Sequence, residues 1–73
     1  MSKALNIRIA MSQAIKGRIE AQEIKGPTRQ AKVALEMLIG AVAALKHIGR
    51  EEEANALSGT ALLVSIRGIG ELP

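Results

Sequence analysis

The sequence contains no cysteine, no aspartate and no aromatic residue, and it has a single histidine. Without cysteine the chain forms no disulfide, which fits a reducing compartment, so we expect a cytoplasmic protein. A lone imidazole without aspartate argues against a metal site and against a nucleophile–base system, so we expect no cofactor and no enzymatic activity. The absence of aromatic rings also removes the stacking platforms that bind unpaired bases.

Length limits what the chain can build. The 73 residues suffice for one small domain, residues 1–73, which buries only a modest share of its surface. Small domains usually gain extra stability from disulfides, a metal or oligomerisation, and only the last of these remains here. We therefore expect the chain to bind itself as a homodimer or a larger assembly.

The longest uncharged apolar run, MLIGAVAAL at residues 37–45, lies between Glu36 and Lys46. It is less than half of the roughly 20 residues that a membrane-spanning helix requires. The run predicts a buried core helix, and we expect no membrane partner.

Positive charge is concentrated in the first part of the chain. Residues 1–32 hold seven Lys and Arg side chains against two Glu, a net +5, whereas residues 33–73 hold three against five, a net −2. A basic segment suits a polyanion such as nucleic acid, although it is also common on the solvated face of a small protein.

Helical spacing dominates the chain after residue 12. The pattern predicts a helix capped by Ser12 that ends at Gly26, and a second from about residue 29 to residue 48 that begins at Pro27 or Thr28. A third helix is predicted over residues 51–67, with three glutamates in its first turn. Residues 62–67 are also compatible with a strand.

The stretch LNIRI at residues 5–9 follows a different period. Leu5, Ile7 and Ile9 alternate with Asn6 and Arg8, which is the period of a strand. A single strand leaves its backbone groups unpaired, so we expect residues 4–11 to pair with the same strand of a second copy. Such a two-stranded ribbon fits the DNA major groove, where arginine reads guanine and asparagine reads adenine.

Over residues 3–45 this pattern resembles the ribbon–helix–helix family of DNA-binding regulators. The resemblance rests on the alternating LNIRI, on a helix ending at Gly26 and on a second helix beginning near Thr28. It implies a mainly α fold, with a short N-terminal strand and two helices over residues 3–48, to which residues 51–67 add a third helix. The resemblance implies five DNA-binding residues. Asn6 and Arg8 would read bases, and Lys3, Thr28 and Arg29 would hold phosphate near the ribbon and the start of the second helix.

The alternative is an all-α three-helix bundle in which residues 2–25 form one helix. One broad side of that helix then holds Leu5, Ile9, Ile15 and Ile19 but also Arg8, Ser12 and Lys16, which makes the helical pattern imperfect.

Two functions follow. The first is a homodimeric, sequence-specific DNA-binding protein, a transcriptional regulator or antitoxin-like repressor, with residues 51–69 available to a second protein. The second is a small helical protein-interaction module, such as a phage-type inhibitor, a chaperone-like protein or an assembly subunit, that binds no DNA.

Overall fold

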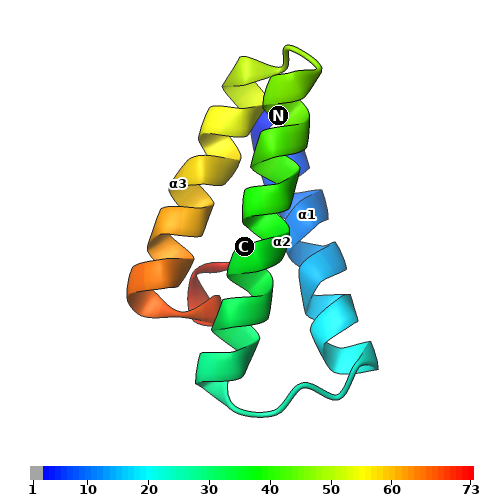
Figure 1. Cartoon of the computed structure of the whole chain (residues 1–73), viewed down its shortest axis with the longest axis vertical. Coiled ribbons are helices and arrows are strands. Elements are labelled where there is room, and N and C mark those ends of the chain that lie inside the picture. Colours follow the sequence, from blue (N-terminus) through cyan, green and yellow to red (C-terminus); the bar gives the residue numbers. More distant parts are fainter. Residues whose placement is uncertain (1–2) are drawn as a thin grey trace.

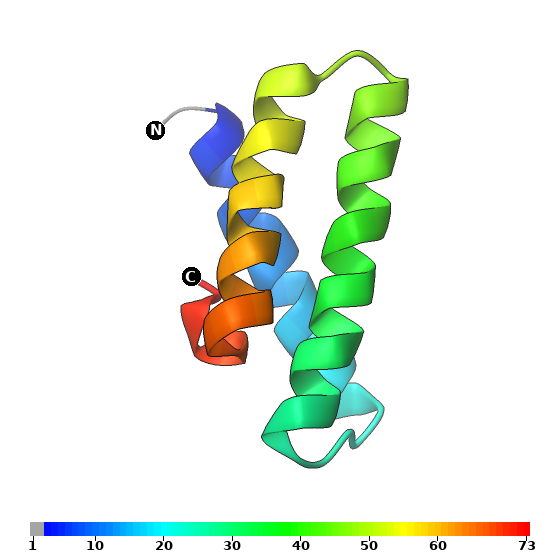
Figure 2. The same ribbon diagram turned by 60° about the vertical axis from the view of Figure 1, so that its left-hand side comes forward.

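The computed structural model describes residues 3–73, and these residues form three α-helices and one short 3-10 helix. Helix α1 spans Lys3–Ala21, α2 spans Pro27–His47 and α3 spans Glu51–Arg67, and η1 follows at Ile69–Glu71. Helices α2 and α3 form an antiparallel hairpin, and α1 packs across one side of it (Figures 1 and 2). The all-α three-helix architecture is therefore the one observed.

The predicted N-terminal strand is wrong, because residues 4–11 belong to α1. A helix satisfies its backbone groups within the segment, whereas a strand here would require a second copy. Three polar side chains made the helical pattern look poor, namely Arg8, Ser12 and Lys16. Each has a partner in the folded chain: Arg8 Nε donates to Thr60 Oγ1, Ser12 Oγ donates to the Arg8 carbonyl, and Lys16 Nζ donates to the Leu72 and Pro73 carbonyls.

Helix α1 also ends earlier than Gly26, where the sequence analysis placed its end. The last helical residue is Ala21, and Glu23 takes the left-handed conformation with φ 53°. The Ile24 N–H reaches back to the Ile19 carbonyl at 3.1 Å, as in a Schellman motif. This turn brings Ile24 against the core beside the buried Ile19, and that contact explains why the chain leaves the helix here.

The starts and ends of α2 and α3 follow the predicted signals closely. Pro27 is the first residue of α2, so Gly26 rather than Thr28 occupies the N-cap position. Gly49, with φ 81°, ends α2 in a second Schellman motif, in which the Arg50 N–H donates to the Leu45 carbonyl at 2.9 Å. Helix α3 continues through Arg67, so residues 62–67 are helical as the main prediction had it.

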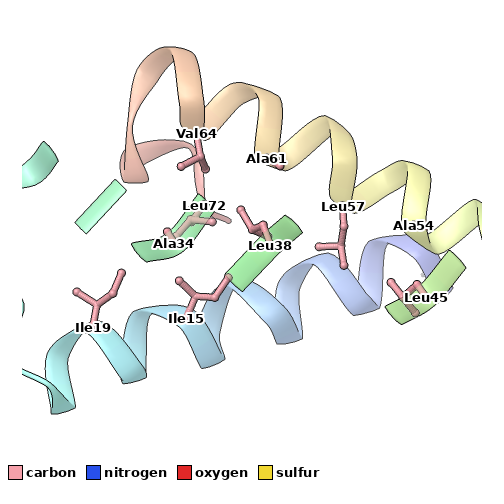
Figure 3. Packing of buried hydrophobic residues seen from close by; sticks show 10 residues of the cluster. All are labelled: Ile15, Ile19, Ala34, Leu38, Leu45, Ala54, Leu57, Ala61, Val64 and Leu72. Carbon is pink, nitrogen blue, oxygen red and sulfur yellow. The ribbon is translucent and has the colours of Figure 1, made fainter. Parts of the chain in front are cut away.

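The core is aliphatic and lies between all three helices (Figure 3). Leucines and alanines of α2 and α3 meet across the hairpin, and Ile15 and Ile19 of α1 close it from one side. Leu72 fills the core where α2 and α3 separate beside η1. The ten buried apolar side chains are Ile15, Ile19, Ala34, Leu38, Leu45, Ala54, Leu57, Ala61, Val64 and Leu72.

Among residues 3–73, no helix has both the length and the apolar character needed to cross a membrane.

Candidate interaction surface

The five residues predicted to contact DNA do not come together in the structure. Helices α1 and α2 begin at opposite ends of a molecule 34 Å long, so Lys3 and Asn6 lie far from Thr28 and Arg29 (Figure 2). Lys3 and Asn6 line a shallow hollow with Arg50 and Glu53, beside the α2–α3 turn. Thr28 and Arg29 are exposed in the first turn of α2.

Arg8 is directed towards α3 rather than outwards with Asn6. Its Nε atom donates a 2.8 Å hydrogen bond to the hydroxyl of Thr60, which is buried, and the Arg8 side chain is partly buried itself. In a strand Asn6 and Arg8 would share a face, whereas in α1 they lie more than half a turn apart. The paired reading edge formed by Asn6 and Arg8 is therefore absent from α1.

Two ion pairs join charged side chains within residues 3–73. Arg50 and Glu53 form a 2.6 Å ion pair at the start of α3, and Arg67 lies 3.7 Å from Glu71 at its end. No cluster of three or more potential metal ligands occurs within residues 3–73. A hollow beside the α1–α2 loop contains both cations and anions, including Lys16, Glu20, Glu23 and Lys25, which do not form a reactive set.

The most unusual surface feature is a group of large apolar side chains that remain in solvent. On α2, Ile39 is 56% exposed, and on α3, Leu62 and Ile66 are 60% and 69% exposed. Most small domains expose single apolar residues, so three on neighbouring helices matter only if they share a face.

Contacts to α1 show on which side of the hairpin these residues lie. Thr60 faces α1, because it accepts the hydrogen bond from Arg8. Leu62 follows Thr60 by two positions, which is slightly more than half a helical turn, so it faces away from α1. Ile66 lies one turn further along the same stripe as Leu62.

Contacts of Gln30 show which side of α2 faces α1. Gln30 faces α1, because it lines a hollow with Lys16 and Ile19 and donates to the Ile24 carbonyl. Ile39 follows Gln30 by nine positions, two and a half turns, so it lies on the opposite side of α2. Leu35 and Val42, both partly buried, share the stripe of Ile39 at helical spacing.

The two stripes meet at one level of the hairpin and extend from it in opposite directions, with Ile39 and Val42 towards the turn and Ile66 away from it. Leu35 lies fourteen residues before Gly49 and Leu62 lies thirteen after it, and α2 and α3 run antiparallel on either side of this turn. Together they form one apolar surface on the side away from α1, which we call the distal face. Its members are Leu35, Ile39 and Val42 of α2 and Leu62 and Ile66 of α3.

Ile48 provides an internal contrast to the distal face. It is 63% exposed at the C-cap of α2, but it follows Ile39 by nine residues and so lies on the opposite side of the helix. It is a solitary exposed isoleucine with almost the same exposure as Ile66.

Charge differs between the two ends of the distal face. At the turn end, the charges of Glu51, Glu52 and Lys46 sum to a net −1 when the paired Arg50 and Glu53 are left out. At the opposite end, Arg29 and Lys32 are exposed in the first turns of α2 and the exposed Glu36 follows one turn after Lys32, giving a net +1 once Arg67 and Glu71 are set aside as a pair. The distal face is thus an apolar strip with an acidic end and a basic end.

The sequence analysis expected residues 51–69 to be available to a second protein, and Leu62 and Ile66 lie within that range. That expectation stays a prediction. The contribution of α2 was missed, because the apolar run at residues 37–45, which includes Ile39 and Val42, was interpreted as a buried core helix. Only the position of α1, on one side of the hairpin, shows that the other side is open.

Comparison with known proteins gives no further guidance, since no family model, curated protein or solved structure matches the chain.

Proposed function

We propose that this chain is a small all-helical protein-interaction module that binds a partner protein through the distal face. The observation that carries the proposal is the placement of Ile39, Leu62 and Ile66, all more than half exposed, on one side of the α2–α3 hairpin. Contiguous exposed apolar surface with charged ends is typical of protein-binding sites on otherwise soluble domains.

The total surface of the chain supports this proposal. Its accessible surface is 4756 Å² for a mass of 7.7 kDa. A compact monomer of that mass exposes about 4,300 Å² by the usual size relation. An uncovered side of the hairpin contributes to this excess of about a tenth.

Site-specific photo-cross-linking in the cells from which the chain comes tests the proposal. A benzophenone amino acid at position 62 should give adducts of protein mass, because the side chain lies within the proposed interface. The same amino acid at position 48 should give none, since Ile48 has similar exposure on the other side of α2. No adduct from position 62, or equal adducts from both positions, would contradict the proposal.

A second candidate function is DNA binding as a transcriptional regulator or antitoxin-like repressor, which the net +5 of residues 1–32 favours. Without a ribbon, an exposed helix would have to enter the groove. The most outward stripe of α1 offers Asn6 and Gln13 among the small residues Ala10, Ala14 and Gly17, with little positive charge. This composition favours DNA binding less than the distal face favours protein binding.

A gel shift with mixed-sequence DNA at moderate salt separates the two functions. A retarded complex that weakens on all sequences in Arg29→Ala would support DNA binding through a phosphate contact. No retardation at any protein concentration tested would remove this second candidate.

A further inference from the structure

We propose that the occupant of the distal face is a second copy of this chain, docked with its hairpin antiparallel to the first. This inference rests on the proposed function, because it names the partner of the same surface. Three observations support it: the size of the face, the arrangement of its charges and the position of its apolar centre.

Size favours a partner that covers the whole side of the molecule. The chain measures 34 × 21 × 20 Å, so one long side offers a projected area of about 700 Å². Contact over the whole of both sides would bury at most about 1,400 Å² in total, and this upper bound lies within the range of roughly 1,200–2,000 Å² found for stable protein interfaces. A single peptide helix laid along the hairpin would cover only part of this side, whereas an identical hairpin matches it in length and width.

Charge favours the antiparallel orientation. A two-fold axis across the middle of the hairpin places the net −1 turn end of one copy against the net +1 end of the other. Opposite charges then face each other at both ends of the dimer, because a two-fold interface repeats each contact. The parallel orientation would instead place Glu51 and Glu52 against the same residues of the partner, which is repulsive.

Two of the three exposed apolar side chains lie close to where such an axis would pass. Ile39 is the thirteenth of the 21 residues of α2, and Leu62 is the twelfth of the 17 residues of α3. These two therefore lie near the middle of the hairpin, whereas Ile66, the sixteenth residue of α3, lies towards its basic end. Contacts near the centre of an interface are usually the ones that carry binding free energy, with charged residues at the rim setting orientation.

Self-association is measured first by light scattering coupled to size exclusion over a wide concentration range. Wild type should approach twice the chain mass of 7.7 kDa as concentration rises. Ile66→Lys should raise the dissociation constant at least about tenfold, because it places a charge within the apolar strip. Ile48→Lys is the matched control and should leave the constant unchanged, since both lysines lie at helix C-termini, where the dipole accepts positive charge.

Orientation is tested by reversing the charges at the two ends. Glu51→Lys with Glu52→Lys, and separately Arg29→Glu with Lys32→Glu, should each weaken the dimer about three- to tenfold. All four substitutions in one chain should restore it, because the reversed ends again oppose each other in an antiparallel dimer. In a parallel dimer the combined chain would stay weak, so failure of this rescue overturns the orientation. Circular dichroism of each variant checks that the helices are retained.

The outcomes separate this inference from the function on which it depends. A wild type that stays at 7.7 kDa throughout, while position 62 cross-links to a different protein, would overturn the second copy and leave the interaction module standing. A monomer that gives no adduct from position 62 would overturn both. A dimer that survives Ile66→Lys and Leu62→Lys would show that the copies meet elsewhere.

Discussion

Helix α1 and the distal face of the hairpin have opposite arrangements of polarity. On α1, Arg8 and Ser12 face the bundle interior and are satisfied by hydrogen bonds. On the distal face, Leu62 and Ile66 face solvent with no covering element within residues 3–73. Burying a cation costs free energy unless it is hydrogen-bonded, and exposing large apolar side chains forgoes the gain from burial. The inward polar groups fix how α1 docks, and the outward apolar groups remain for a partner.

The largest expected difference in the free energy of unfolding is between alanine substitutions of two leucines of α3 that lie five residues apart. Leu57 is fully buried between the helices, whereas Leu62 is 60% exposed. Leu57→Ala should lower the free energy of unfolding by about 2–5 kcal/mol, through lost burial and the cavity left behind. Leu62→Ala should change it by less than about 0.5 kcal/mol in dilute solution. Chemical denaturation at low protein concentration measures both, and similar losses would mean that the distal face is already covered.

The next effect concerns the inward polar contact between α1 and α3. Thr60→Val keeps the shape of the side chain but leaves the Arg8 Nε–H without its acceptor in a partly buried setting. We expect a loss of about 1–2 kcal/mol in the free energy of unfolding. The control is Arg18→Met on the exposed side of α1, which should stay within about 0.5 kcal/mol.

A double-mutant cycle isolates this contact. Thr60→Val in an Arg8→Met background should cost less than it costs in wild type, because the donor is already gone. If the two losses simply add, the hydrogen bond does not contribute to holding α1 against α3.

The smallest effect is a gain at the end of α1. Glu23 holds a left-handed φ of 53°, a conformation that glycine adopts without a steric penalty. Glu23→Gly should therefore raise the free energy of unfolding by about 0.5–1 kcal/mol. Gln22→Gly, next to it and without positive φ, should lower it instead. Thermal melts measure both variants. If their melting temperatures shifted in the same direction relative to wild type, the proposed turn would be contradicted.

Local signals in the sequence were sufficient for the hairpin but not for α1. Gly49 and the glutamates of residues 51–53 mark the α2–α3 turn, and these signals act within a few residues. The partners of Arg8 and Lys16 are Thr60, Leu72 and Pro73, which lie 52 to 57 positions away. No local pattern shows that such polar residues will be satisfied inside a bundle, so the alternation of LNIRI suggested a strand.

The candidate site was visible only in part for a related reason. The spacing of Leu62 and Ile66 shows a second apolar stripe on α3, beside the one that forms the core. Whether that stripe is covered depends on the side of the hairpin on which α1 docks. That choice is made by tertiary contacts, among them Arg8 with Thr60.

Intermolecular methyl contacts test the central claim most directly. A sample mixing two isotopically distinct copies of wild type, with labelled Ile and Leu methyl groups, reports contacts only between different molecules. The account predicts intermolecular nuclear Overhauser effects at Ile39, Leu62 and Ile66 and none at Ile48. Intermolecular contacts at Ile48, or none at the distal face in a sample shown to be dimeric, would contradict it.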